Sequence, residues 1–196
     1  MTEKFLKAKH WQLFLLTFGI PIGFQFIMMG SMISNIGTNP DSTMMFNYMK
    51  LFPIIMLVFM GVFFGWFWSV AIGLQSKVPE SVKMKVKKFK VFFFIPMVYM
   101  LLITLFMLIS MNGLMTNGTE PSGVLIGFLF AIIVPLHLFS MFCIFYSLYF
   151  VAKTFKTVEL QREVSFSDFV GEFFLIWFYP IGIWFIQPKI NKMIEK

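Results

Sequence analysis

The chain has 196 residues, of which 59% are hydrophobic and only 13% are charged, whereas an ordinary soluble domain carries about 25% charged residues. Its formal net charge of +7 does not indicate a nucleic-acid-binding surface, because the lysines lie between long apolar runs and not along one soluble face. A single cysteine, Cys143, excludes an intramolecular disulfide. The composition therefore predicts an all-α polytopic integral membrane protein that forms one membrane domain over residues 1–196.

Four apolar runs are each long enough for a helix that crosses ~30 Å of bilayer hydrocarbon: residues about 11–33, 51–74, 91–111 and 124–151. Polar, turn-rich connections at residues 34–50 and 112–123 separate the first pair and the last pair. Every apolar segment also contains one proline: Pro21, Pro53, Pro96, Pro135 and Pro180. Proline is common in membrane helices; alternatively, these prolines bend the helices around a cavity.

Small residues mark a possible packing face on the first two runs. The second run has four of them at a spacing of four: Gly61, Gly65, Ser69 and Gly73. The first run has a shorter pair, Gly19 and Gly23. Helices in lipid associate through such faces, because small side chains let two backbones approach closely. We expect the two faces to pack against each other within the chain; a seam between two copies is the alternative.

The connection between the second and third runs is strongly basic. Its lysines are candidates for contact with anionic lipid headgroups: Lys83, Lys85, Lys87, Lys88 and Lys90. The connection could continue the third run as a helical turn, with Val82, Val86, Phe89 and Phe93 along one side and lysines around the rest. The alternative is that these lysines only set the orientation of the chain in the membrane.

Three polar residues stand within or beside the apolar runs: Gln25, His137 and Glu172. Ionisable residues inside a membrane are costly and often functional, so they form a candidate polar site. The alternative for His137 is a neutral imidazole that bonds to the Ala131 carbonyl or to Gln25. Glu172 could instead position its segment near the membrane surface, or meet the lysines of the basic connection.

The last apolar segment, residues about 166–188, follows a capping box in which Ser165 precedes Asp168 by three residues. Its uncharged core, residues 173–186, would be ~21 Å long as a helix, which is shorter than the bilayer hydrocarbon. Pro180 and Gly182 interrupt it where a hairpin would turn. We expect a re-entrant or interfacial segment with a helical first half over residues 166–179; a fifth span is the alternative.

Basic residues predict the orientation of the chain through the positive-inside rule. They gather in the N-terminal arm, in the connection at 75–90 and after the fourth run, while Lys50 is the one basic residue of the other two connections. The N-terminus is therefore expected in the cytoplasm. If the last segment crossed, it would carry Lys189, Lys192 and Lys196 outside, so the C-terminus is expected in the cytoplasm as well.

Three common catalytic motifs are absent from the sequence. It has no phosphate-binding glycine loop, no zinc-binding HExxH pair and no Gly-x-Ser-x-Gly elbow. With two histidines and one cysteine in the whole sequence, most catalytic constellations cannot be assembled. We therefore expect a non-enzymatic protein without cofactor or metal, a scaffold or accessory subunit that binds another membrane protein or a second copy. The alternative is a small transporter or channel whose polar path runs along Gln25, His137 and Glu172.

Two stretches, KAKHWQLFLLTFGIPIG at residues 7–23 and DFVGEFFLIWFYPIGIWFIQPKINK at residues 168–192, resemble the ends of small four-span inner-membrane proteins of Bacteroidota-type bacteria. That group carries no assigned activity. The resemblance therefore implies a location in the inner membrane and no mechanism.

Overall fold

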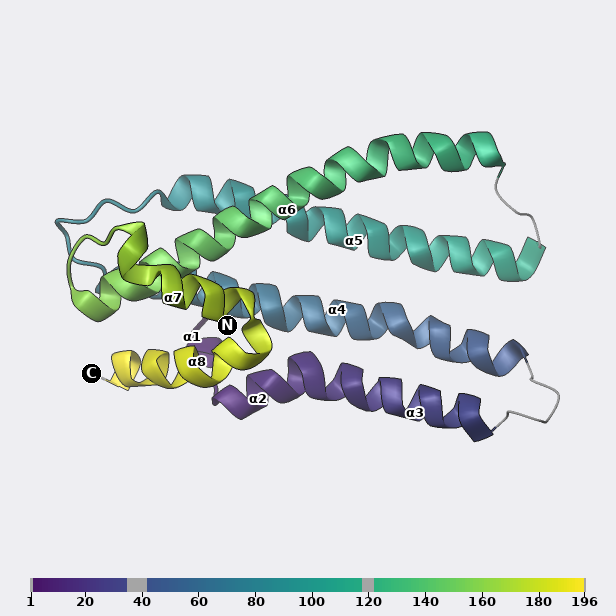
Figure 1. Ribbon diagram of the computed structural model, residues 1–196, viewed down its shortest axis with the longest axis horizontal. Coiled ribbons are helices and arrows are strands. Elements are labelled where there is room, and N and C mark those ends of the chain that lie inside the picture. The colour runs from purple at the N-terminus through teal and green to yellow at the C-terminus, as the bar shows by residue number, and fades with distance from the viewer. Residues whose placement is uncertain (1, 35–41, 118–121, 196) are drawn as a thin grey trace.

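The computed structural model describes residues 2–34, 42–117 and 122–195, and every regular element in these ranges is a helix (Figure 1). The elements are α1 (Thr2–Lys7), α2 (His10–Phe14), the π-helical segment η1 (Leu15–Gly19), α3 (Ile20–Ser34), α4 (Ser42–Gly73), the 3₁₀ turn η2 (Gln75–Lys77), α5 (Val86–Asn117), α6 (Gly123–Leu160), α7 (Phe166–Trp177) and α8 (Tyr179–Glu195).

Four helical stretches are long and apolar enough to cross a membrane: His10–Ser34, Leu51–Lys77, Val86–Ser110 and Leu129–Leu160. They correspond to the four predicted runs, and the predicted all-α polytopic fold is confirmed. The helices extend into the predicted connections, because α4 already begins at Ser42 and α5 continues to Asn117. The rest of those connections, residues 35–41 and 118–121, lies outside the described residues.

The first span is continuous through a π-helical turn ahead of Pro21. In η1 the N–H of Ile20 donates to the carbonyl of Leu15, five residues back. A π turn widens the helix locally, which accommodates a proline that lacks an N–H and would crowd the preceding turn. The prolines of the other three spans, Pro53, Pro96 and Pro135, lie inside α4, α5 and α6.

The buried core lies at one end of the bundle, on the left in Figure 1, where the short helices gather around the long ones. Its largest fully buried side chains include Trp66, Phe67, Phe89, Phe155 and Phe169. At the opposite end the long helices expose large apolar side chains such as Ile109 and Phe130, and no residue of α3 is buried. The protein therefore packs tightly at one end and presents apolar helix surface along the rest of its length.

The last apolar segment forms a hairpin of α7 and α8 whose two outer ends lie at the core end of the bundle (Figure 1). The turn occurs at Phe178 (φ −84°, ψ 57°), so the first helix ends slightly earlier than Tyr179, where the sequence predicted it. Pro180 instead becomes the second residue of α8, where the helix leaves N–H groups free anyway. Since α7 has 12 residues and α8 has 17, neither matches the ~20 residues of a spanning helix.

A close backbone approach holds the two arms of the hairpin together. A Cβ atom added at Gly182 would lie 1.6 Å from the carbonyl oxygen of Leu175. Only glycine fits at this position, because any side chain would force α7 and α8 apart. Gly182, predicted to lie in the break itself, is also the residue of α8 that allows this close approach to α7.

The corner between α6 and α7 is fixed by polar contacts. The predicted capping box is present, since the carboxylate of Asp168 accepts a hydrogen bond from the N–H of Ser165 at 2.8 Å. Arg162 donates to the same carboxylate at 2.8 Å. The Arg162 guanidinium and the Ser165 donors together hold the pKa of Asp168 well below its usual range.

The N-terminal helix α1 is tied to α8 by two amide side chains. The fully buried Gln187 accepts a hydrogen bond from the indole N–H of Trp66 in α4 at 2.7 Å. Its amide nitrogen donates to the carbonyls of Leu6 at 3.0 Å and Ala8 at 2.8 Å, and Asn191 donates to the same two carbonyls. Because the last carbonyls of a helix lack partners within it, these amides satisfy the end of α1 and join α1, α4 and α8.

Candidate functional site

The part of the small-residue stripe of α4 from Gly65 to Gly73 packs within the chain, but against α1, whereas a Cβ at Gly61 would meet nothing within 4 Å. A Cβ atom at Gly65 would lie 2.6 Å from the ring of Phe5, and one at Gly73 would lie 2.7 Å from side-chain atoms of Leu6 and Thr2. Ser69, the small residue between the two glycines, donates to the Gly65 carbonyl at 2.7 Å. This part of the stripe is thus the surface of α4 against which the N-terminal helix packs.

The expected pairing of this stripe with Gly19 and Gly23 is wrong. The three atoms nearest to a Cβ at Gly19 all belong to Leu15 of the same span, and a Cβ at Gly23 would meet nothing within 4 Å. The first span contacts α4 through aromatic rings instead, with Phe18 edge-on to Phe59 at a centroid distance of 6.0 Å. Gly19 is half-buried and Gly23 is exposed, so only Gly23 of this pair stays uncovered by the rest of the described chain.

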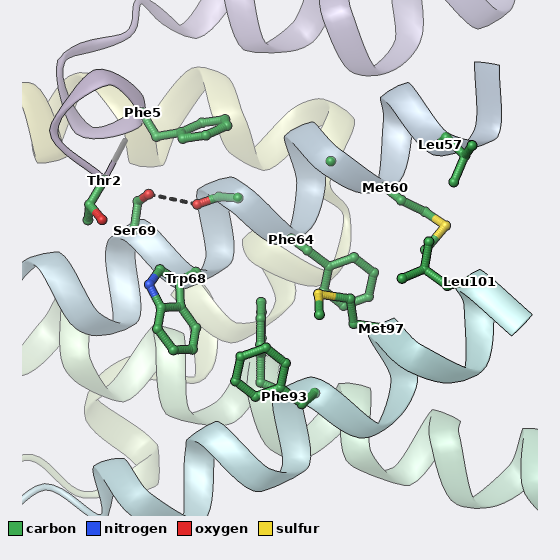
Figure 2. Close-up of a pocket in the computed structure, with 13 residues that line it drawn as sticks. Thr2, Phe5, Leu57, Met60, Phe64, Trp68, Ser69, Phe93, Met97 and Leu101 are labelled. Atoms are coloured by element: carbon green, nitrogen blue, oxygen red, sulfur yellow. Dashed lines mark hydrogen bonds between the residues drawn. The ribbon is translucent and has the colours of Figure 1, made fainter. Parts of the chain in front are cut away.

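An apolar cavity of about 460 Å³ lies between α1, α4 and α5. Figure 2 shows Phe5 and Ser69 at one end of this cavity and Leu57, Met60 and Leu101 at the other. The hydroxyl of Ser69 is already bonded to the Gly65 carbonyl, drawn as a dashed line in Figure 2. The cavity therefore suits an apolar side chain or an acyl chain and has little to offer a hydrated solute.

The three residues of the candidate polar site do not come together. Gln25 is exposed on α3, while His137 on α6 pairs with a different residue, the hydroxyl of Tyr99, 3.2 Å from its Nδ1. Neither alternative for His137, the Ala131 carbonyl or Gln25, is its hydrogen-bond partner. Tyr99 was not identified from the sequence, because only the packing of α5 against α6 brings it beside His137.

Glu172 belongs to a cluster of charges at the core end of the bundle. Lys156 of α6 lies 2.8 Å from Glu172 and 2.7 Å from Glu159, and Lys189 of α8 lies 3.1 Å from Glu159. At ~1.5 Å per residue, Lys156 stands about 28 Å along α6 from His137. Glu172 therefore links α7 to α6 and has no contact with His137, and its partner is not a lysine of the basic connection.

The predicted headgroup-contacting lysines are all exposed: Lys83, Lys85, Lys87, Lys88 and Lys90. The helix begins later than the proposed continuation of the third run, because α5 starts at Val86. Val82 and Phe89 are nevertheless buried beneath this basic surface, as the apolar side of the pattern predicted. The ammonium of Lys90 lies over the ring of Trp68, 5.8 Å from its centroid.

Metal-ligating side chains do not cluster in the described ranges, where no group of three or more His, Cys, Asp or Glu residues could hold an ion. Comparison of the chain with protein-family models, with curated proteins and with solved structures found no match. What the chain does must therefore be inferred from its own geometry: four apolar spans, a tightly packed end and exposed glycines on α3.

Proposed function

We propose that this chain is a non-enzymatic membrane scaffold or accessory subunit that binds a transmembrane helix of another membrane protein through α3. One observation carries the proposal. The face of α3 that carries Gly23 and Gly30, which is suited to close helix contact, is not covered at these glycines by any other part of the described chain.

The uncovered face continues along α3. Added Cβ atoms at Gly23 and Gly30 would each meet nothing within 4 Å, and Phe26 between them is 71% exposed. Residues at these spacings of three and four lie on one face of a helix. The glycines leave shallow gaps on either side of the Phe26 ring, and a partner helix could approach closely there while packing around the ring.

A transporter or channel that uses Gln25, His137 and Glu172 is the weaker candidate. Such a path needs polar groups that line one continuous passage. The three residues stand on different helices, His137 and Glu172 have separate partners, and the cavity between α4 and α5 is apolar. This arrangement favours a binding role over conduction.

We infer that both termini face the cytoplasm of a bacterial inner membrane and that the α7–α8 hairpin enters the membrane from that side. The basic connection, the N-terminal helix and the charged end of α8 all gather at the core end of the bundle, which supports this orientation through the positive-inside rule. A periplasmic phosphatase fused after Lys196 should be inactive, whereas a fluorescent reporter there should fold. An active phosphatase would contradict the inference.

The partner face can be tested with a photo-crosslinking amino acid at position 26 of the full chain in intact cells. We expect one discrete adduct with a second membrane protein, and none from the same amino acid at Met32, which is exposed on another face of α3. Gly23→Leu should abolish the adduct at position 26, because the larger side chain fills the gap that the partner needs. The matched control is Gly127→Leu, since Gly127 on α6 stands in equally open space.

The results of these experiments distinguish a scaffold that binds another protein from a dimer of this chain and from a transporter. An adduct of twice the mass of the chain would show that the partner is a second copy of the chain. Crosslinking only to lipid at both positions would contradict the proposal. Solute or proton flux in liposomes that His137→Ala abolishes would instead favour the transporter.

A further inference from the structure

We propose that a basic cavity between the 78–85 connection, α5 and α6 binds the phosphate-bearing headgroup of an anionic phospholipid. This site is separate from the partner face on α3 and does not rest on it. The cavity has a volume of about 340 Å³. Its lining residues are Lys83, Met84, Lys85, Lys88, Tyr146, Tyr149, Phe150, Lys153 and Glu163.

The positive charge of the cavity lining favours the binding of an anion. Four lysines from three segments of the chain converge on it, against the single carboxylate of Glu163. None of the four forms an ion pair within the described residues, where the paired cations are Lys7, Lys156, Arg162 and Lys189. Bringing like charges together is unfavourable, and a phosphate group among them would offset that repulsion.

Aromatic rings position one of these cations. The ammonium of Lys88 lies 5.0 Å from the ring centroid of Tyr146 and 5.4 Å from that of Phe92, a geometry in which the rings attract the cation. Tyr149, also in the lining, is stacked against Phe166 of α7 at 6.2 Å. These contacts hold the ammonium group of Lys88 at the cavity lining without neutralising its charge.

The position of the cavity indicates a lipid as the source of the phosphate. Lys88 stands in the first turn of α5 and Lys153 about two turns before the end of α6, so both mark the same end of two candidate membrane spans. Next to the cavity, Phe92 packs against Phe142, which is 58% exposed. A lipid whose headgroup occupies the cavity would lay its acyl chains against this apolar surface, whereas free phosphate would leave it unused.

The structure divides the lysines that the sequence grouped together. Lys83, Lys85 and Lys88 line the cavity, and Lys153 of α6 joins them. Lys90 lies over Trp68 and Lys87 is outside the lining. A general attraction to an anionic surface would involve all of these lysines alike, so this division makes the proposal testable.

The test uses the full chain in mild detergent, titrated with phosphatidylglycerol or with phosphatidylcholine of the same acyl chains, and bound lipid is counted by native mass spectrometry. Phosphatidylglycerol should bind more tightly than phosphatidylcholine. Lys88→Gln and Lys153→Gln should each weaken phosphatidylglycerol binding about five-fold, the usual contribution of one basic residue near an anionic surface. Lys153→Arg should retain binding, and Lys87→Gln and Lys90→Gln, which change the net charge equally, should stay within about two-fold of the wild type.

Equal affinity for the two lipids would overturn the proposal, and so would an equal loss of phosphatidylglycerol affinity in all four glutamine variants. Binding of inorganic phosphate without lipid, weakened by the same lysine substitutions, would also overturn it, because free phosphate would then be the ligand. Thermal melting of each variant in detergent checks that the fold is intact. Because Lys88 and Lys153 lie on different helices, a variant that unfolds at one position leaves the other to decide.

Discussion

Replacing Gln187 with leucine should loosen the contact of α1 and α8 with α4. The substitution removes the acceptor of the Trp66 indole N–H, and Trp66 is only 1% exposed. A buried donor without a partner costs ~1–3 kcal/mol. The carbonyls of Leu6 and Ala8 keep Asn191 as a donor, so the loss of their bonds to Gln187 adds only ~1 kcal/mol. We expect a total destabilisation of ~2–4 kcal/mol.

Thermal unfolding in detergent, followed by intrinsic fluorescence, measures this effect. For a chain of this length, ~2–4 kcal/mol corresponds to a fall in melting midpoint of about 4–16 °C. Gln25→Leu is the matched control, because Gln25 is exposed on α3 and the same substitution there should leave the midpoint unchanged. Adding Trp66→Phe to Gln187→Leu removes the unpaired donor, so the double variant should be more stable than the sum of the two single losses predicts.

The reasoning would be refuted if Gln187→Leu melted like Gln25→Leu. It would also be refuted if the effects of Gln187→Leu and Trp66→Phe were additive, since additivity would show that the two side chains do not depend on each other in the folded protein.

Three further predictions concern two close contacts and one partly buried carboxylate. Gly182→Ala should destabilise the hairpin by ~3 kcal/mol or more, because its methyl group would overlap the α7 backbone; Gly171→Ala, in open space on α7, should not lower the melting midpoint. Gly65→Leu should displace α1 and destabilise the fold by ~1–3 kcal/mol. Gly61→Leu should be tolerated, because a Cβ there meets nothing within 4 Å. Equal melting midpoints for the two variants would contradict the packing of α1 against Gly65. The pKa of Asp168 is lower in the folded chain than the ~3.9 of an unfolded one. The ionised carboxylate therefore stabilises the fold fully at pH values above ~3.9, and this stabilisation is lost as the pH falls toward the folded-state pKa. The difference in melting midpoint between wild type and Asp168→Asn should be constant near neutral pH and shrink below about pH 4.

Local features of the chain were predictable from the sequence, since each depends on residues close together. The four spans follow from the length of the apolar runs alone, because ~20 apolar residues are needed to cross a bilayer. The capping box at Ser165 and Asp168 requires only a spacing of three. The hairpin in the last segment follows from a run too short to span and from the break near Pro180, although the turn itself falls at Phe178.

Contacts between distant segments could not be read from spacing. The stripe at Gly65 and Gly73 was identified, but α1 occupies it in place of the first span, which contacts α4 through Phe18 and Phe59 instead. His137 was identified without its partner Tyr99, and Glu172 without Lys156. Each partner lies on another helix, and only the rotation of one helix against the next decides which side chain it meets.

The sequence by itself determined that this protein is a helical bundle with four apolar spans and a broken C-terminal segment, since hydrophobic length and local hydrogen bonding are properties of contiguous residues. Only the tertiary structure decided that Gln187 and Asn191 complete the end of α1, that Gly23 and Gly30 of the first span stay uncovered, and that Lys153 joins Lys83, Lys85 and Lys88 around one cavity. These arrangements depend on how rigid helices of fixed side-chain positions dock against one another, and that docking is a property of the whole chain.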